Sequence, residues 1–492
     1  MQAVVERASA LFAEDRAGEA LSLLGPHLGG PVVDPVLWHL AGACHLRLGD
    51  VAQGEACWRE VLRIRPDFAE LEFDLALLLM HLGRSDEAEG GLRRAAAMRP
   101  GVAAIRFELG NLRFARGDAA GAEAAWRETL RLEPEHALAL NNLGVLLNRR
   151  APVPEAEAAY RRALRARPDF VDAAWNLSLL LLATGRFAEG FCLYEFRYHP
   201  GRSERRTVPI EAPYPMWQGE EVSGKSFLVV AEQGYGDQMQ FGRFVALLKA
   251  RGAGRIVLLC TAPVAALLAT LEGLDQVLVE EETCHFPQCD YWTFLLSLPH
   301  RQGITLETLP ARLPYLRVPR GTAAVLDALP PGRLRVGLVW KGDVTNRASA
   351  HRFLPGLATL APLWRVPGVA FVSLQKGAGE EEGRDPGPDQ PLWHPELRDF
   401  AHTAAVVAQL DLVIAIDTAV VHLAGALQRP CWVLLPAEGC DWRWMHDPTT
   451  SPWYPGVVRL FRQEVAGDWS AVVDAVRCAL ARLVSGSVAR LD

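Results

Sequence analysis

A glycine-rich turn in the middle of the chain carries the first residues that could do chemistry. The run Glu232-Gln-Gly-Tyr-Gly-Asp237 directly follows an apolar stretch, residues 227–231, that is typical of a buried strand. Gly234 and Gly236 let the backbone approach a ligand, and the free N–H groups of a helix opening near Asp237 attract an anion. Asp237 would then lie at the carboxyl end of a strand, where open α/β sheets bind ligands. The alternative, an ordinary helix cap beside plain turn glycines, fits the local pattern equally well.

A second group of candidates follows a later apolar run, residues 412–416. Asp417 and Thr418 come at the expected strand end and helix start, where a hydroxyl and backbone amides can hold a phosphate or a sugar hydroxyl. His422 lies one helical turn after Thr418 and on the same helix face. A single histidine in a helix is usually structural, so both interpretations stay open for His422.

Basic residues in two other polar loops complete the candidates. Lys376, beside Gln375, and Arg352 have the charge needed to neutralise a diphosphate leaving group. The alternative is that both are ordinary surface charges. The chain has no Asp-x-Asp motif, so we expect neither a metal ion nor another cofactor.

Composition narrows the classes of protein to which the chain can belong. At 492 residues it should form several domains, and its net charge of −7 gives no basic footprint for nucleic acid. No apolar run is long enough to span a bilayer, and the N-terminus has no secretory h-region. Nine scattered cysteines indicate a reducing compartment, and Cys284, His285 and Cys289 lack a fourth ligand for zinc. We therefore expect a cytoplasmic protein.

A period of 34 residues runs through the first two hundred residues. Small residues hold two positions of each period, a large residue follows four positions after the second, and a proline closes the period. This is the template of the tetratricopeptide repeat, in which small residues let two helices cross closely. We expect about five repeats over residues 35–200, preceded by one degenerate pair of helices. The positions are Gly42, Ala76, Gly110, Gly144 and Ser178; Gly54, Ala88, Ala122, Ala156 and Gly190; Trp58, Leu92, Trp126, Tyr160 and Tyr194; and Pro66, Pro100, Pro134 and Pro168.

The first helices of such repeats line a concave surface. Their sixth positions carry Asp74, Glu108, Asn142 and Asn176. Asparagine side chains there can hold the backbone of an extended peptide through paired hydrogen bonds, so we expect Asn142 and Asn176 to contact a polypeptide. The alternative is that these positions are only solvated polar faces.

The second half of the chain has a different rhythm. The repeats (residues 1–204) should end in a linker rich in proline and glycine (residues 205–221), in which Trp217 packs on the following domain. Apolar runs then alternate with helical segments, as in parallel sheets covered on both faces. We predict two Rossmann-like lobes, residues 222–330 and 331–492, facing one cleft. The expected strands are residues 227–231, 255–260, 276–279, 335–340, 370–374, 412–416 and 431–435, with a last helix at 469–483.

Five segments of the chain carry a family resemblance. They are Glu232 to Phe241, Val336 to Trp340, Ser373 to Gly377, Asp411 to Leu427 and Asp441 to Gln463. In this order they look like bacterial glycosyltransferases with tetratricopeptide repeats, whose catalytic half is similar to the heptosyltransferase family of GT-B fold. The resemblance implies an all-α repeat solenoid followed by an α/β GT-B-like pair of lobes. It also implies an inverting, metal-independent transferase that uses a nucleotide-activated sugar.

The resemblance also assigns roles to residues. The acid of the glycine-rich turn, Asp237, is the candidate general base, and Asp417, Thr418 and Lys376 would contact the donor. One segment departs from the family pattern, which tends to have Ser-Gly-Asn-Pro after the tryptophan, whereas this chain has Lys341-Gly-Asp-Val344. The remaining donor-side candidates are Gly234, Gly236, Arg352, Gln375 and His422.

Three functions follow from this reading. The first is transfer of a sugar to Ser or Thr of a polypeptide recruited by the repeats, with flagellin as a leading acceptor and a nonulosonic acid as a possible donor, because some relatives resemble flagellin glycosyltransferases. The second is transfer to lipopolysaccharide or another glycan. The third is a binding scaffold whose transferase half has lost activity. A cut after residue 204 is expected to leave a folded α/β half.

Overall fold

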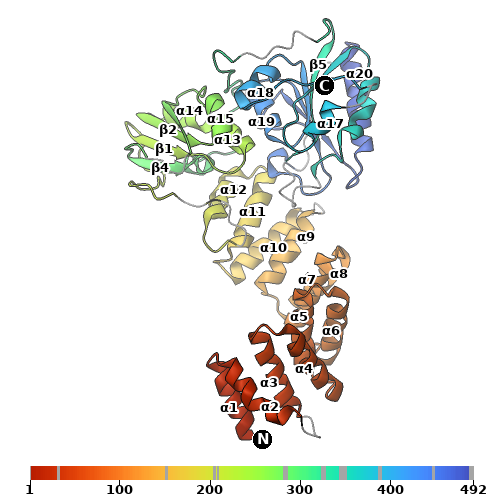
Figure 1. Cartoon of the computed structure of the whole chain (residues 1–492). Coiled ribbons are helices and arrows are strands. Elements are labelled where there is room, and N and C mark those ends of the chain that lie inside the picture. Colours follow the sequence, from red (N-terminus) through yellow and green to blue (C-terminus); the bar gives the residue numbers. More distant parts are fainter. Residues whose placement is uncertain are drawn as a thin grey trace. The chain divides into compact units, whose positions relative to one another are not determined.

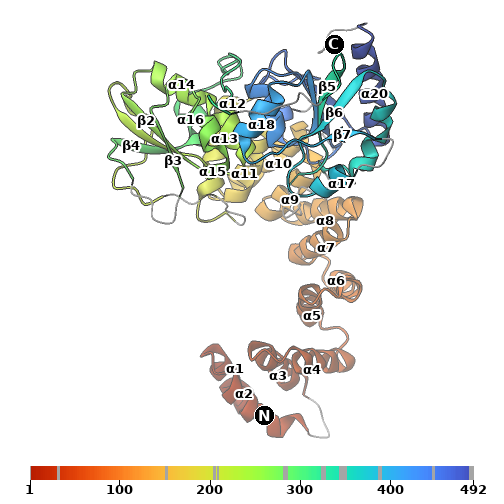
Figure 2. The ribbon, with the colours of Figure 1, turned by 45° about the horizontal axis from the view of Figure 1, so that its top comes forward.

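The fold was analysed in a computed structural model of the whole chain (Figures 1 and 2). The structure describes residues 2–29, 34–149, 153–202, 207, 210–280, 286–322, 329–342, 352–385, 390–445 and 449–486. Residues 343–351, most of the segment 341–352 in which the sequence departs from the family pattern, lie outside this set, as do Cys284 and His285. The chain forms two compact units, one of Met1–Leu147 with Pro154–Phe170 and one of Asn148–Val153 with Val171–Asp492.

The helical part confirms the 34-residue period. The first helices of the repeats are α3 (Pro35–Arg47), α5 (Ala69–His81), α7 (Ala103–Ala115), α9 (Ala137–Arg149) and α11 (Val171–Ala183), which begin 34 residues apart. The second helices are α4 (Val51–Ile64), α6 (Ser85–Met98), α8 (Ala119–Leu132), α10 (Val153–Ala166) and α12 (Phe187–Tyr194). The expected preceding pair is α1 (Gln2–Ala13) and α2 (Ala17–Leu28).

Close packing explains the pattern of small and large residues. A Cβ on Gly110 would lie 2.5 Å from Trp126 Nε1, and one on Gly144 would lie 2.6 Å from Tyr160 Cε1. The large residue of each second helix therefore occupies the space that the small residue of the first helix leaves open. The turn between the two helices has its own requirement, because Gly49 and its equivalents adopt φ near +80°, which favours glycine.

The first sheet has four parallel strands in the order β3-β2-β1-β4. They are β1 (Ser226–Val230), β2 (Arg255–Cys260), β3 (Gln276–Val279) and β4 (Tyr291–Phe294). The helices around this sheet are α13 (Tyr235–Phe241), α14 (Arg243–Ala250), α15 (Ala262–Leu268) and α16 (Leu298–Arg301). The order reverses between β1 and β4, so the chain leaves these neighbouring strands in opposite directions.

The second sheet has six parallel strands in the order β10-β9-β8-β5-β6-β7. The strands are β5 (Leu334–Val339), β6 (Val369–Ser373), β7 (Leu392–Trp393), β8 (Leu412–Ile416), β9 (Cys431–Leu435) and β10 (Val458–Arg462). Its helices are η4 (Leu357–Arg365), α17 (Glu380–Arg384), α18 (Phe400–Val407), α19 (Ala419–Ala426) and α20 (Ser470–Val484). Here the order reverses between β5 and β8, and Asp417 follows β8 directly. An α-helical repeat region followed by an α/β region with two parallel sheets is the fold class that the sequence predicts.

One apolar cluster joins both sheets to the last helical pair, α11 and α12. The ring of Phe187 lies 5.7 Å from that of Trp453, and the ring of Phe191 lies 6.0 Å from that of Trp442 and 6.3 Å from that of Phe241. The repeat pattern predicts a domain boundary at residue 204. The packing instead divides the chain before α11, because this helical pair shares its core with the α/β half and the second compact unit continues from Val171.

Two further expectations from the sequence concern the packing of Trp217 in the linker and membrane-spanning helices. Trp217 is fully buried and packs against Phe227 of β1, as expected. None of the described helices is both long and apolar enough to cross a membrane.

Candidate functional site

Asp237 lies in the first turn of α13, just beyond the carboxyl end of β1. Because α13 begins at Tyr235, Asp237 is its third residue, and its Oδ2 accepts the backbone N–H of Gly234 at 2.9 Å. Its Oδ1 forms an ion pair with Arg443 of the second sheet's half. The side chain is 20% exposed. Asp237 therefore caps α13 from within the helix and has a charged partner from a distant segment.

Gly236 of α13 packs closely against the start of α19. A Cβ on Gly236 would lie 2.7 Å from His422 Cδ2 and 3.3 Å from Ala419 Cα. Any larger residue would push the two helices apart. The sequence predicted that Gly236 lets the backbone approach a ligand. In the structure Gly236 also lets the start of α13, beside the first sheet, pack against the start of α19, beside the second sheet.

Arg443 is the centre of the polar contacts around Asp237. It lies in η5 (Trp442–Trp444), in the segment that follows β9, and its side chain is 7% exposed. Its Nη1 contacts both carboxylate oxygens of Asp441 at 2.9 and 3.1 Å, and its Nε donates to Gln240 Oε1 at 2.6 Å. Our reading of the sequence did not identify this residue. The sequence Asp441-Trp-Arg-Trp444 could have indicated it. An arginine between two tryptophans is expected to be buried, and a buried arginine requires acidic partners.

Arg462 and Gln463 hold the segment that carries Arg443. Arg462 Nη2 donates to the carbonyl oxygens of Trp444 and Met445 at 2.6 and 2.7 Å, and Gln463 Oε1 accepts the N–H of Ala437 at 3.2 Å. Arg462 is the last residue of β10, which lies next to β9, and Gln463 follows it directly. The position of Arg443 is therefore fixed by two neighbouring strands.

Burial and the nearby guanidinium groups shift the pKa values of the three acids in opposite directions. Burial raises the pKa of Asp237, and the Arg443 guanidinium opposes that rise without cancelling it. Burial together with the nearby Asp441 raises the pKa of Asp417 to about 6. For Asp441 burial acts in the same direction, but Arg443 and Arg352 outweigh it and leave its pKa below the usual value. Three carboxylates thus share two guanidinium groups.

Asp417, Thr418 and His422 stand at the start of α19. Asp417 Oδ2 lies 3.6 Å from Arg352 Nη1. Thr418 is the N-cap of α19, and its buried hydroxyl has no hydrogen-bond partner among the described residues. His422 Nδ1 pairs with Tyr454 Oη at 2.9 Å, and its ring stacks on Trp444 at 5.5 Å. Burial and Arg443 lower the pKa of His422 to about 3, so its imidazole is neutral at physiological pH.

Gln375 and Lys376 are placed differently from the other candidates. Gln375 Oε1 accepts the N–H groups of Trp340 and Lys341, both at 3.0 Å, and its Nε2 donates to the carbonyls of Lys341 and Ala378. These four bonds use the full capacity of the amide, which joins the loops after β5 and β6. Lys376 is 63% exposed and its Nζ lies 3.5 Å from Glu380 Oε1. Donor contact by either residue stays a prediction.

Asn142 belongs to a chain of amides in the repeats. Its Nδ2 donates to Asn111 Oδ1 at 3.0 Å, and its Oδ1 accepts from Asn141 at 3.3 Å. Asn111 also donates to Glu108 Oε2 at 3.1 Å and accepts from Trp126 Nε1. Asn176, in α11 of the other compact unit, is not free either. Peptide contact by Asn142 or Asn176 stays a prediction.

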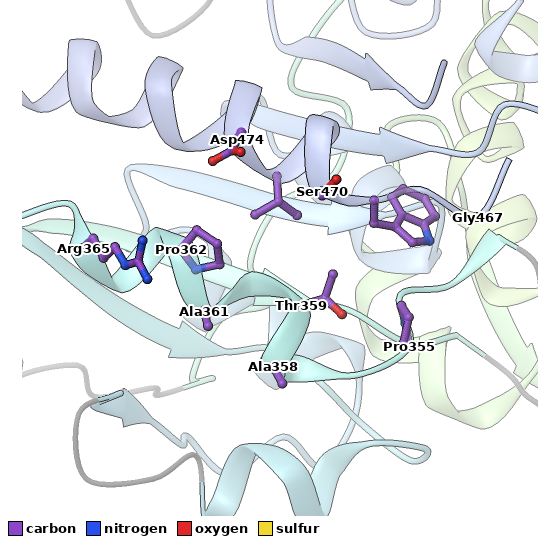
Figure 3. A pocket seen from close by; sticks show the side chains of 11 residues that line it. Pro355, Ala358, Thr359, Ala361, Pro362, Arg365, Gly467, Ser470 and Asp474 are labelled. Atoms are coloured by element: carbon purple, nitrogen blue, oxygen red, sulfur yellow. The ribbon is translucent and has the colours of Figure 1, made fainter. Parts of the chain in front are cut away.

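A pocket of about 530 Å³ lies apart from these residues, between η4 and the start of α20 (Figure 3). Its lining includes Thr359, Arg365, Ser470 and Asp474. None of the predicted site residues lines it. Among the described residues no group of His, Cys, Asp and Glu side chains is arranged to hold a metal ion.

Comparison with known proteins supports the helical part most directly. A tetratricopeptide repeat family model matches residues 44–103, 107–151 and 153–195, so this region is a run of such repeats. Protein FlbA of Caulobacter vibrioides is 31% identical over 328 residues, which cover 61% of this chain and 53% of FlbA. The chain thus spans about half the length of that relative. The crystal structure of MamA is 21% identical, with a TM-score of 0.30, and covers 32% of this chain and 91% of MamA. That of YrrB, a TPR protein with an unusual peptide-binding site, is 20% identical, with a TM-score of 0.32, over 35% of this chain and 88% of YrrB.

Proposed function

We propose that the protein is an O-glycosyltransferase that moves a sugar from a nucleotide-activated donor to a Ser or Thr hydroxyl of a polypeptide held by the repeats. One observation carries the proposal. An acid at the carboxyl end of β1, Asp237, lies in a helix whose start packs against the start of α19, which follows the carboxyl end of β8. Both positions are ligand sites in α/β sheets, and a helix start favours phosphate.

The chemistry assigns one role to each side of the site. Asp237 accepts the proton of the acceptor hydroxyl as that oxygen bonds to the anomeric carbon of the sugar. The bond between the anomeric carbon and the phosphate oxygen breaks in the same step, and the nucleotide leaves with both bonding electrons. The start of α19, the Thr418 hydroxyl and Arg352 stabilise the charge on the departing phosphate. The reaction inverts the anomeric centre and uses no metal ion.

The environment of Asp237 suits a general base. Burial raises its pKa, so its carboxylate is more basic than that of an exposed aspartate. Arg352, 29% exposed, has a buried Nε without a partner among the described residues. Together with the unpartnered Thr418 hydroxyl it offers hydrogen-bond donors that a phosphate oxygen can use.

The repeats supply the acceptor in this proposal. Tetratricopeptide solenoids bind extended peptides on the surface formed by their first helices, and Asn142 lies in such a helix. Flagellin is our leading acceptor and a nonulosonic acid a possible donor sugar. We place the reaction in the cytoplasm, where nucleotide-activated sugars are available.

One observation favours a second function, a binding scaffold without transferase activity. Both oxygens of Asp237 already have partners, Gly234 and Arg443, so the base is occupied until one of them moves. In a binding scaffold the contacts of Asp237 with Gly234 and Arg443 would never open. The protein would then act only by binding a partner through its repeats.

Mass spectrometry of glycopeptides decides between the two functions. We would delete the gene in its host and complement it with the wild type, with Asp237→Asn, or with Asp474→Asn as a matched control, since Asp474 is an exposed acid of α20. The proposal expects Ser- or Thr-linked glycopeptides to vanish on deletion and to return with the wild type and the control only. Full recovery with Asp237→Asn would remove Asp237 as the base, and an unchanged glycopeptide set after deletion would favour the scaffold.

A further inference from the structure

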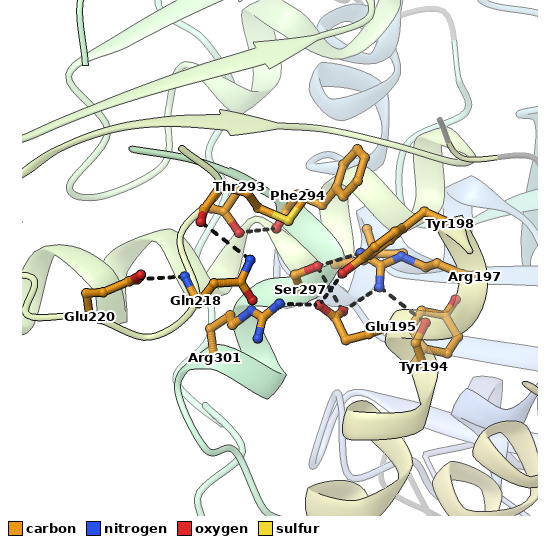
Figure 4. A network of polar contacts seen from close by, with 12 residues as sticks. Tyr194, Glu195, Arg197, Tyr198, Gln218, Glu220, Thr293, Phe294, Ser297 and Arg301 are labelled. Carbon is orange, nitrogen blue, oxygen red and sulfur yellow. Dashed lines mark hydrogen bonds and ion pairs between the residues drawn. The ribbon is translucent and has the colours of Figure 1, made fainter. Parts of the chain in front are cut away.

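A buried cluster of charges lies where the last helical pair meets the first sheet (Figure 4). Arg197, in η1 (Glu195–Tyr198) directly after α12, is its centre and is 1% exposed. Its Nη2 contacts Glu232 Oε1 at 2.6 Å and Ser297 Oγ at 2.7 Å, and its Nη1 contacts Glu195 Oε1 at 2.6 Å. Arg301 Nη2 adds a contact to Glu195 Oε2 at 3.2 Å. We call these five residues the Arg197 cluster.

The Arg197 cluster occupies the place where the order of the first sheet reverses. Glu232 follows β1 and Ser297 follows β4, and Glu232 Oε1 also accepts the N–H of Leu296 at 3.3 Å. In an open α/β sheet such a crevice between diverging strands is the usual ligand site. Here a side chain from the helical pair fills it. Glu232 also opens the glycine-rich turn that leads to Asp237.

The end of α12 and the following η1 hold two successive residues of that turn. Arg197 holds Glu232, and the Tyr194 hydroxyl donates to Gln233 Oε1 at 3.4 Å. Gln233 has φ of +62°, a conformation that a residue with a side chain adopts only when its surroundings impose it. The next residue is Gly234, whose N–H binds Asp237. The contacts therefore form a continuous path from Arg197 through the turn to Asp237.

We propose that Arg197 is a positioning residue for Asp237. By holding Glu232 it keeps Gln233 in its left-handed conformation and thereby directs the Gly234 N–H at the carboxylate. The assignment of Asp237 to a reaction rests on the proposed function, whereas the ordering of the turn does not. The last helical pair is thus a working part of the α/β half, although its sequence is that of a repeat.

Buried charge pairs are poor stabilisers, which argues for a geometric role. Removing two charges from water is costly, and an apolar pair of similar size often stabilises a fold as well or better. Arg197 has six acceptor contacts, which lie on Glu232, Ser297, Glu195 and the carbonyl of Tyr194, and an apolar side chain cannot reproduce them. An arrangement of this kind determines where the turn lies.

Amide hydrogen exchange of the full-length protein tests the inference without any assay of transfer. In Arg197→Met we expect the peptides that cover residues 229–241 to exchange at least about tenfold faster. This is a cautious figure, because breaking a buried ion pair can change an equilibrium by more than about tenfold. The Gly234 and Gln238 amides are the reporters, since both are hydrogen-bonded in the intact turn. Peptides covering β8 and α19 should change much less. Arg197→Lys, which can reach Glu232 but cannot make all the other contacts, should fall between.

Two further variants separate positioning from a general loss of stability. Arg197→Met with Glu232→Gln leaves no unpaired charge, so it folds more readily, yet the turn should still exchange faster than in the wild type. Arg94→Met breaks the pair between Arg94 and the buried Glu72 in the other compact unit and should leave residues 229–241 unchanged. An equal increase in all peptides, or wild-type exchange of the turn in the double variant, would overturn the inference. A loosened turn in a protein that transfers no sugar would keep the inference and refute the proposed function.

Discussion

Replacing Arg443 by methionine should destabilise the α/β half strongly, because the change leaves buried acids without their cation. Arg443 contacts Asp237 and both oxygens of Asp441, whose side chains are 20% and 23% exposed. Breaking a buried pair by removing one partner costs about 3–5 kcal/mol. A change of that size lowers the melting temperature of a unit of this length by about 4–7 °C.

The loss should depend on pH in a direction that the buried acids set. Without Arg443, burial raises the folded-state pKa of Asp237 further above its unfolded value near 3.9, and the pKa of Asp441 rises because it loses the larger of the two charges that lower it. A raised folded pKa gives stability that is present at low pH and is lost as pH rises through that pKa. The deficit of Arg443→Met relative to the wild type should therefore be larger at pH 8 than at pH 5.

Urea unfolding of both proteins at the two pH values measures this deficit. Arg462→Met is the matched control, since Arg462 holds the same segment but binds the carbonyl oxygens of Trp444 and Met445 and no carboxylate. Its deficit should be the same at pH 5 and pH 8. Adding Asp237→Asn to Arg443→Met should recover part of the loss by removing one unpaired charge. An Arg443→Met protein as stable as the wild type, or equally weakened at both pH values, would refute the reasoning.

The remaining predictions concern the acids, the domain boundary and the repeats. Asp237→Asn should lower the transfer rate by about 10²–10⁴, as removal of a general base does, with little change in melting temperature, and a rate within a few-fold of the wild type would contradict this role. Asp417→Asn should stabilise the protein more at pH 8 than at pH 4 in urea titrations, because the wild-type carboxyl, with its pKa raised to about 6, loses stability over that range. Deleting residues 1–170 should leave a unit with a single cooperative thermal transition, whereas deleting residues 1–204 removes Arg197 and the α12 aromatics and should abolish that transition. Asn142→Ala should weaken binding of the acceptor polypeptide in calorimetry, and the loss of its bonds to Asn111 and Asn141 should lower the melting temperature of the repeats by only a few degrees.

The repeats and most strands could be predicted from the sequence because their signals are local. The 34-residue period fixed the starts of five helices, and the predicted strands at 255–260, 276–279, 412–416 and 431–435 match β2, β3, β8 and β9. The other three predicted strands are shifted by one residue. The strands that were missed, β4, β7 and β10, are short or interrupted by polar residues, so their apolar runs do not stand out.

The site could be predicted only in part because its contacts join distant segments. The glycine-rich turn indicated Asp237 as a candidate residue, and the apolar run before Asp417 predicted the helix start that is now α19. No local pattern predicts that Arg443, 206 residues after Asp237, supplies its counter-ion, or that Arg197, from the helical half, holds Glu232. The domain boundary is a similar case. The repeat pattern places it at residue 204, whereas α11 and α12 share their core with the α/β half, because a repeat pattern records how helices pair and not which core they join.

In the proposed reaction, the pairing of Arg443 would let Asp237 act as a base although both its oxygens are engaged. Arg443 contacts Asp441 through both of that residue's oxygens and Gln240 through Nε, so it stays paired when it leaves Asp237. An acceptor hydroxyl can therefore replace the Arg443 contact at Oδ1 while the Gly234 N–H still orients Oδ2. The carboxylate then loses the cation that lowers its pKa and keeps the burial that raises it. Binding of the acceptor would in this way make Asp237 more basic at the moment when a proton must be taken.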